Sequence, residues 1–313
     1  MHTLRLALLP AALAALAVLS TPPLDAQAPA AFPADGNVAG SHWSRLVNVA
    51  AAGRVIFGSF TPGKSPDDAV AAARNPLPDF WFYDMEHTPF DMETFRTWLQ
   101  FTLDPTALRR PGPPRITPVL VRIPANGREM NQWMAKQILD TGGLGVVTPH
   151  IETAAQARNV VRATRYRQAE GAADFEPEGQ RGSGAGNAVR FLGAPFADYM
   201  RKADVWPLDP DGEIFNLLLI ENGEGVRNIA EIVRVPGVSA VAAAPGDLGA
   251  YHSGDRARVE RDIQTIVDAC TAVKMICGIT AGAGDVERRI QQGFTLLIGD
   301  DAMIRAGHAV AKR

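Results

Sequence analysis

The segment Asp79-Phe-Trp-Phe-Tyr-Asp-Met-Glu-His-Thr-Pro89 joins a run of large apolar side chains to three ionisable groups. Residues 80–83 form a near-continuous apolar run, which is typical of a strand buried on both faces in a parallel sheet under helices. Asp84, Glu86 and His87 follow at once, and charge at the end of such a strand costs desolvation energy unless partners are supplied. Active sites of α/β folds are built at the carboxyl ends of strands. The segment therefore predicts a parallel α/β fold and the edge of an active site.

Strand-like and helix-like segments alternate through the rest of the chain. Eight apolar runs of strand length occur between segments whose apolar residues have helical spacing. This count predicts a single (β/α)₈ TIM barrel over residues 43–313, with an open doubly wound sheet as the alternative. No dinucleotide-binding Gly-x-Gly-x-x-Gly or phosphate-loop pattern is present, which weakens a nucleotide-binding interpretation. The expected strands are 54–60, 79–87, 118–124, 144–149, 215–221, 238–244, 274–280 and 294–299, and the expected helices are 67–74, 90–101, 129–140, 153–164, 196–202, 226–233, 256–273 and 285–292.

Two segments interrupt this alternation. Residues 104–115 are rich in proline, and residues 167–195 carry many Gly, Pro and charged residues. Loops of this length inside a compact domain are usually functional or disordered. We expect both segments to reshape the mouth of the site.

The first residues have the features of a secretory signal. A short basic start is followed by an apolar Ala/Leu run at residues 6–19, and Ala26-Gln-Ala28 has the small-x-small pattern of a signal peptidase site. The run of about 14 residues is shorter than the roughly 20 needed to span a bilayer. We expect a signal peptide at 1–28, a flexible leader at 29–42 and a periplasmic or secreted mature chain without a membrane span. An uncleaved anchor is the alternative.

The net charge argues against nucleic-acid binding, and the cysteine content argues against a disulfide. The net charge is −3, so the chain has no basic footprint for nucleic acid. The two cysteines, Cys270 and Cys277, are expected on a helix and the following strand. A reduced, buried pair is favoured over a disulfide, although an exported protein could form one.

Polar residues recur where the expected strands end. Glu221 and Asp247 would lie on neighbouring strands, about 4.8 Å apart, where two carboxylates repel unless a cation or proton lies between them. Mg²⁺ or Mn²⁺ with oxygen ligands would fit such a pair. The alternative is that Asp247 caps the next helix. The whole set comprises Asp84, Glu86, His87, Arg122, Glu221 and Asp247.

The residues near the opening segment suit proton transfer. His87 is the natural proton carrier because histidine side chains have an intrinsic pKa near neutrality, and Asp84 could orient its imidazole. A buried His–Asp contact without chemistry is the alternative. Arg122 on the adjacent strand offers a planar fork for a carboxylate or enolate oxygen. Metal, base and Arg together suit proton abstraction or C–C cleavage next to a carbonyl.

An ordered set of motifs resembles the HpcH/HpaI aldolase/citrate lyase family over roughly residues 45–305. No single motif is specific for this family, but the order in which the motifs occur is. They are Asp84-Met-Glu-His87, Pro118-Val-Leu-Val-Arg122, Thr148-Pro-His-Ile-Glu152, Arg181-Gly-x-Gly184, Leu219-Ile-Glu221, Ala244-Pro-Gly-Asp-Leu248, Gly278-Ile-Thr280 and Leu297-Ile-Gly-Asp300.

The resemblance implies a class II pyruvate aldolase on a phosphoenolpyruvate/pyruvate-type barrel, assembled as a homotrimer or homohexamer with an exchanged C-terminal helix. Such an enzyme reversibly cleaves a 4-hydroxy-2-keto acid to pyruvate and an aldehyde through a metal-bound enolate. The implied cofactor is Mg²⁺ or Mn²⁺, with Co²⁺ or Zn²⁺ as alternatives. The implied roles are metal binding by Glu221 and Asp247, acid/base catalysis by His87 with Asp84, pyruvate binding by Arg122, substrate contacts from Arg181, Gly182, Pro245 and Gly246, and contact of Glu86 with metal-bound water.

Departures from the family pattern leave other functions open. Leu219 replaces a common Gln, and His150 stands where an apolar residue is usual, so we interpret His150 as a rim residue rather than a substrate contact. A secretion signal is unusual for a catabolic aldolase. The alternatives are a decarboxylase or hydratase that uses the same metal–enolate site, and an exported barrel that binds carboxylates without catalysis.

Overall fold

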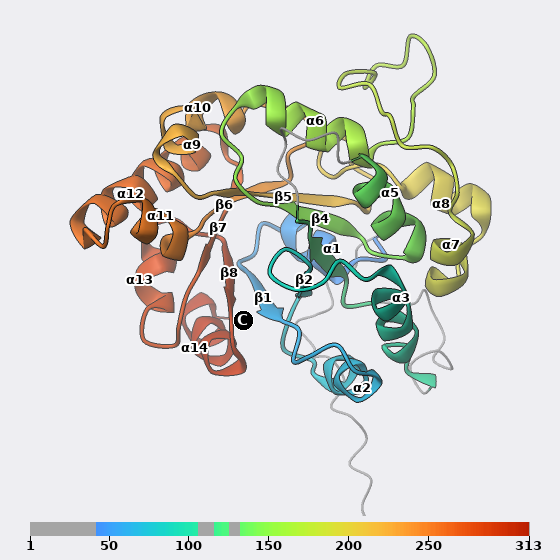
Figure 1. Cartoon of the computed structure of the whole chain (residues 1–313), viewed down its shortest axis with the longest axis horizontal. Helices are drawn as coiled ribbons and strands as arrows, with labels where there is room; N and C mark the ends of the chain where they lie inside the picture. The colour runs from blue at the N-terminus through green and yellow to red at the C-terminus, as the bar shows by residue number, and fades with distance from the viewer. Residues whose placement is uncertain (1–41, 106–115, 125–131, 313) are drawn as a thin grey trace, which may run out of the picture. The chain divides into compact units, whose positions relative to one another are not determined.

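The computed structural model describes residues 42–105, 116–124 and 132–312, all within one compact unit of the chain. Within these ranges, eight parallel strands hydrogen-bond in sequence order, and β8 pairs with β1 to close the barrel. Figure 1 shows the helices arranged around these strands. The predicted (β/α)₈ barrel is therefore confirmed, and the open sheet is excluded. The strands are β1 (Ile56–Phe60), β2 (Phe80–Asp84), β3 (Val119–Arg122), β4 (Gly145–Thr148), β5 (Phe215–Ile220), β6 (Ala240–Ala243), β7 (Ile276–Thr280) and β8 (Leu296–Gly299).

The apolar run of β2 is continuous because both of its faces are buried. Phe80 and Phe82 belong to the apolar cluster inside the barrel, whereas Tyr83 lies outside it. The Tyr83 ring packs edge-on against Phe95 and Trp98, with centroids 5.0 and 5.5 Å away. Burying each such ring contributes roughly 1.5–3 kcal/mol. The alternation fixes which later residues of β2 face the barrel axis.

The helices begin where the sequence supplies capping side chains. Ser65 and Asp68 form a capping box at the start of α2, and Thr153 and Gln156 form another at the start of α6. The predicted helix at 226–233 is two short helices, α9 and α10. The prediction missed α1, α7 and α11, and α14 was expected only as the C-terminal helix that the resemblance implies. The helices are α1 (Arg45–Ala51), α2 (Pro66–Arg74), α3 (Met92–Phe101), α5 (Gln132–Thr141), α6 (Ala154–Thr164), α7 (Gly186–Leu192), α8 (Phe196–Lys202), α9 (Gly223–Arg227), α10 (Ile229–Ile232), α11 (Pro245–Tyr251), α12 (Arg256–Val273), α13 (Val286–Gln291) and α14 (Asp301–Ala311).

Helix α1 adds side chains to the apolar cluster inside the barrel. Leu46 and Val47 are fully buried and belong to the same cluster as Phe80 and Phe82. Glu213, at the entry to β5, accepts hydrogen bonds from the Trp43 and Ser44 amides at 2.8 and 3.0 Å. Because these contacts lie where β5 begins, α1 closes the amino-terminal end of the barrel and leaves the carboxyl end for a site.

The C-terminal helix α14 packs on its own barrel. The rings of Phe57 in β1 and His308 in α14 have centroids 4.9 Å apart. Gly307 makes this approach possible, because a Cβ there would lie 2.2 Å from the Phe57 ring. In the single chain, the helix covers β1 and β8 of the barrel to which it belongs. Its exchange between subunits stays a prediction.

The predicted signal peptide at 1–28 lies outside the described residues, as does the leader at 29–42 apart from its last residue. The same holds for residues 106–115 of the proline-rich segment. No helix in the described part of the chain has the length and apolar character to span a membrane. Cys270 and Cys277 are both buried and free, as predicted.

Candidate active site

Three of the predicted site residues lie in the barrel-facing register at the carboxyl ends of their strands. Along a strand, every second side chain lies on the same face. Two residues before each charged residue, an apolar side chain lies in the cluster inside the barrel. The charged side chains therefore form a polar layer above this apolar core. They are Asp84, Arg122 and Glu221, which follow Phe82, Leu120 and Leu219.

Asp84 and Arg122 form a two-pronged ion pair across β2 and β3. Arg122 Nε donates to Asp84 Oδ1 at 2.8 Å, and Nη2 donates to Oδ2 at 2.7 Å. Burial opposes the charge of both groups. The hydrogen bonds of the pair nevertheless lower the pKa of Asp84 and raise that of Arg122 from their ordinary values. Both groups are therefore held in their charged forms, and the guanidinium plane is fixed.

Glu86 lies between Arg122 and two histidines. Its Oε2 is 3.0 Å from Arg122 Nη1 and 3.4 Å from His87 Nε2, and its Oε1 is 3.5 Å from His150 Nε2. Oε2 is buried, yet it accepts no well-formed hydrogen bond from the described residues. A buried carboxylate oxygen in this state is an acceptor for a water or substrate hydroxyl.

Glu221 is the most deeply buried carboxylate of the site, with 3% of the residue exposed. Burial raises its pKa to about 7, and the negative charges of Asp247 and Glu86 act in the same direction, whereas His150 opposes them. The site thus concentrates negative charge. In the described part of the chain, Glu221 has no direct ion pair with an Arg or Lys, and Arg122 interacts with its charge only from a longer distance. This is an environment in which a cation or a proton is stabilised.

Asp247 lies in the first turn of α11, directly after β6. Strands β5 and β6 are neighbours, and the Ala244 amide donates to the Ile220 carbonyl at 3.2 Å, beside Glu221. Ala244 is the N-cap of α11, so Asp247, in the first turn, is not the N-cap residue. Pro245 and Gly246 precede it at the same end of the barrel.

The predicted pairing of Asp84 with the His87 ring is wrong. Arg122 and the backbone amides of Glu86 and His87 engage the Asp84 carboxylate. The His87 side chain is 66% exposed, and its ion-pair partner is Glu86. The reason is geometric: Asp84 is still on the strand and faces Arg122 in register, whereas His87 lies beyond the strand end.

The prediction that Arg181 and Gly182 close over the site is also wrong. The Arg181 guanidinium is buried, and its Nη2 donates to Asp140 Oδ1 at 2.8 Å and to the Tyr199 hydroxyl at 2.7 Å. Asp140 lies near the end of α5, which leads into β4, and helices of a (β/α)₈ barrel end at the face where the next strand begins. Arg181 and the adjoining Gly182 therefore lie at the amino-terminal face, opposite the site.

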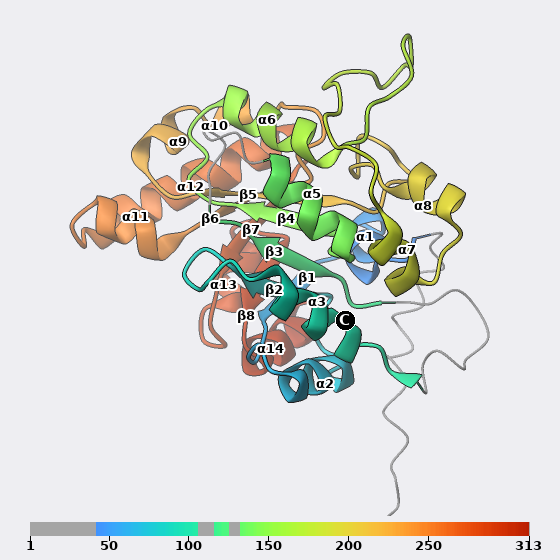
Figure 2. The same cartoon turned by 45° about the vertical axis from the view of Figure 1, so that its right-hand side comes forward.

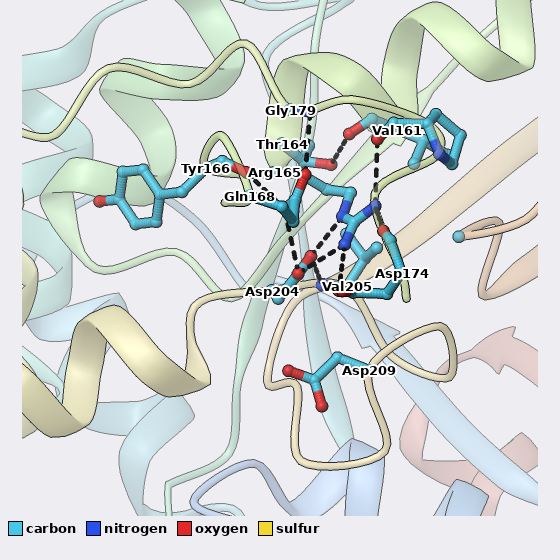
Figure 3. Close-up of polar contacts among 12 residues, drawn as sticks. Val161, Thr164, Arg165, Tyr166, Gln168, Asp174, Gly179, Asp204, Val205 and Asp209 are labelled. Atoms are coloured by element: carbon cyan, nitrogen blue, oxygen red, sulfur yellow. Dashed lines mark hydrogen bonds and ion pairs between the residues drawn. The ribbon is translucent and has the colours of Figure 1, made fainter. Parts of the chain in front are cut away.

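The segment after α6 shares this position, which corrects the expectation that residues 167–195 reshape the mouth. Figure 3 shows Arg165, at the end of α6, holding this segment. Its Nε and Nη2 donate to Asp204 at 2.7 and 2.8 Å, and Nη1 donates to the carbonyls of Asp174 and Pro177 at 2.9 and 3.0 Å. The segment is an anchored structural element that connects α6 to α7, α8 and β5, which Figure 2 displays from a second side.

One site residue, Lys64, was absent from the sequence prediction, and another, His150, was interpreted only as a rim residue. Lys64, in the loop after β1, donates to the Asp84 carbonyl at 2.7 Å and contacts the Thr88 hydroxyl, so it holds the loop that carries His87. Burial lowers its pKa, against the opposing effect of Asp84 and Asp91. His150, interpreted as a rim residue, contacts Glu86 and Glu221. Both lie in loops that follow strands, β1 for Lys64 and β4 for His150, and this position is the signal that could have identified their roles.

The donors present fit a divalent cation held by few protein ligands. Within the described ranges, no three His, Cys, Asp or Glu side chains gather where they could hold a metal ion together. Glu221, with the charge of Asp247 nearby, supplies the oxygen chemistry that Mg²⁺ and Mn²⁺ prefer, and Mg²⁺ is usually bound by one or two carboxylates plus water and substrate. The two-carboxylate arrangement is therefore compatible with such an ion.

Similarity to known proteins identifies the family of this chain. Residues 57–297 match the model of the HpcH/HpaI aldolase/citrate lyase family. The chain is 32% identical to a hydroxypyruvate/pyruvate aldolase from Delftia acidovorans, covering 67% of this chain and 69% of that protein. It is 30% identical to a 2-dehydro-3,6-dideoxy-6-sulfogluconate aldolase from Pseudomonas putida, covering 72% and 79%.

Solved structures confirm the barrel. A HpcH/HpaI family protein from Burkholderia cenocepacia aligns with a TM-score of 0.63 at 24% identity, covering 83% of this chain and 93% of that one. An HpcH/HpaI aldolase from Desulfitobacterium hafniense aligns with a TM-score of 0.64 at 23% identity, covering 84% and 93%. The chain belongs to the HpcH/HpaI aldolase/citrate lyase family and is a carbon–carbon lyase of the aldolase type.

Proposed function

We propose that this lyase depends on a divalent metal, Mg²⁺ or Mn²⁺, and reversibly cleaves a 4-hydroxy-2-keto acid to pyruvate and an aldehyde. The observation that carries the proposal is the buried Glu221 carboxylate, which among the described residues has no direct ion pair with Arg or Lys and whose charge adds to that of Asp247. The names of the relatives, hydroxypyruvate/pyruvate aldolase among them, support a pyruvate-type donor.

Glu221 and Asp247 would hold the metal. When bound, such an ion polarises a carbonyl oxygen as a Lewis acid and orients a chelating keto acid. Arg122, whose plane Asp84 fixes, would donate to the substrate carboxylate and to the oxygen on which negative charge develops. Pro245 and Gly246, which precede Asp247, would line the same end of the site.

His87 would act as the base in the cleavage direction. It takes the proton from the C4 hydroxyl, the C3–C4 bond breaks to release the aldehyde, and the electron pair moves into the enolate of pyruvate. A proton delivered to C3 completes pyruvate. Glu86, 3.4 Å from the His87 ring, would stabilise the imidazolium.

The test is a metal-loaded cleavage assay on 4-hydroxy-2-keto acids of varied length and charge, with pyruvate release as the readout. We expect Glu221→Gln to abolish turnover and Mn²⁺ binding together, because the neutral amide removes the buried charge. His87→Ala should lower cleavage by about 10²–10⁴-fold while pyruvate still binds. Glu93→Gln, at a side chain that is 84% exposed, is the matched control.

Proton exchange of pyruvate in D₂O tests enolate formation separately from cleavage. The wild type should exchange the methyl protons in a metal-dependent way, even if the aldehyde partner is unknown. Exchange at the background rate, or full activity of Glu221→Gln, would refute the proposed mechanism. Release of CO₂ in place of pyruvate from keto diacids would instead indicate a decarboxylase.

We also propose export of the mature chain and its assembly into a homo-oligomer. The basic start, apolar run and Ala26-Gln-Ala28 pattern support export. The half-exposed aromatic side chains Phe60, Phe101, Trp133, Phe196 and Tyr251 are consistent with subunit contacts.

A further inference from the structure

The turn after β4 has an unusual backbone. His150 adopts a φ of 52°, in the left-handed region that residues other than glycine seldom occupy. The following Ile151 amide donates to the Leu219 carbonyl of β5 at 3.1 Å. The chain therefore leaves β4 after Thr148, turns at His150 and contacts β5 again at Leu219, two residues before Glu221.

This turn brings two groups of one residue to the same oxygen. The His150 backbone N–H donates to Glu221 Oε2 at 2.6 Å, and the ring Nδ1 lies 3.0 Å from that oxygen. In a continuing strand, this N–H would instead be committed to a neighbouring strand. The other ring nitrogen, Nε2, lies 3.5 Å from Glu86 Oε1. The ring therefore spans the two carboxylates.

We propose that His150 is a positioning residue for Glu221: its amide and ring together fix the carboxylate that would hold the metal and link it to Glu86. This inference rests on the proposed function, in which Glu221 binds the metal. His150 acts through Glu221 and has no role in breaking the substrate's C–C bond. Partners that orient a metal ligand typically change metal affinity or activity by about 10–100-fold when removed.

Three substitutions separate the ring from the backbone. Asn tolerates a left-handed backbone and keeps a side-chain donor, Gly keeps the backbone and amide but lacks the ring, and Ala disfavours the backbone and lacks the ring. Mn²⁺ affinity of the purified, chelator-treated protein is measured from the electron paramagnetic resonance signal of free Mn²⁺. This readout does not depend on turnover.

We expect Mn²⁺ affinity to fall in the order wild type, His150→Asn, His150→Gly, His150→Ala. The asparagine variant should lie within about threefold of the wild type, the glycine variant about tenfold below it, and the alanine variant lower still. Catalytic efficiency should follow the same order. Equal Mn²⁺ affinity in all four proteins would overturn the proposal, as would a glycine variant that binds as tightly as the asparagine variant.

The control is His42→Asn, which removes a comparable His–Glu contact from the other end of the barrel, where His42 Nδ1 lies 3.4 Å from Glu213. It should leave Mn²⁺ affinity unchanged, and thermal unfolding of every variant identifies any loss of folding. A wild type that binds Mn²⁺ but cleaves no keto acid would refute the proposed function alone. A wild type that cleaves, with variants that bind Mn²⁺ equally, would refute the positioning role alone.

Discussion

At the scale of single residues, the role of a charged side chain depends on which side chains it contacts more than on its residue type. Asp84, Glu86 and His87 are close in sequence, yet their contacts differ: Asp84 pairs with Arg122 at 2.7 Å, whereas the His87 ring has Glu86 as its ion-pair partner at 3.4 Å. Glu86 also reaches Arg122 and His150, which come from β3 and the β4 turn. The chemistry of the segment therefore depends on side chains that other strands supply.

The raised pKa of Glu221 predicts a pH-dependent stability. In the metal-free folded chain its pKa is about 7, against an ordinary value of 4.5, so the folded state binds the proton more tightly than the unfolded state. This contribution to stability is complete below pH 4.5 and is lost as the pH rises through 7. The unfolding free energy should fall across this range by up to about 3 kcal/mol more than in Glu221→Gln.

Denaturant unfolding of the metal-free protein at several pH values measures this difference. Parallel pH profiles for the wild type and Glu221→Gln would contradict it. Addition of Mn²⁺ should reduce the loss at pH 7 in the wild type alone, because a bound cation favours the carboxylate.

At the scale of elements, the segment after α6 depends on one buried side chain. Arg165 is fully buried and pairs with Asp204 and Asp174 in the network of Figure 3. Arg165→Met would leave these carboxylates without their cation, and breaking a buried pair in this way costs about 3–5 kcal/mol. We expect a matching loss of stability and faster proteolysis within residues 167–180.

The control for this prediction is Arg167→Met. The Arg167 side chain is 76% exposed and pairs with Glu178 at 2.8 Å. Exposed pairs contribute about 0–1 kcal/mol, so this variant should unfold and be cleaved like the wild type. Similar behaviour of the two variants would show that burial of Arg165 does not anchor the segment.

At the scale of the whole molecule, export and assembly can be tested together. Cleavage after Ala28 would leave every described residue in the mature chain. Expression with the native start should yield a periplasmic or secreted protein whose intact mass corresponds to a chain that begins at Pro29. Light scattering of this protein should give the mass of a trimer or hexamer. A cytoplasmic, uncleaved chain would refute export, and a monomeric mass would refute assembly.

The sequence by itself determined the barrel and most of its elements. Apolar runs and helical spacing report burial directly, so the eight strands were predicted near their observed bounds. Helices α1, α7 and α11 were missed, and α14 was expected only from the resemblance. Helix α11 shows why: it is seven residues long, and only Leu248 is buried, so it has little apolar pattern.

The tertiary structure alone decided which charged residues meet. Residues at strand ends were identified from the sequence because parallel strands share one carboxyl edge, and Asp84, Arg122 and Glu221 were found there. The pairing of Asp84 with Arg122 depends on strand register, the burial of Arg181 depends on α5 and α8, and the contact of His150 with Glu221 depends on a left-handed turn. Register, helix packing and local φ are set by contacts between distant segments, and a local sequence pattern does not encode them.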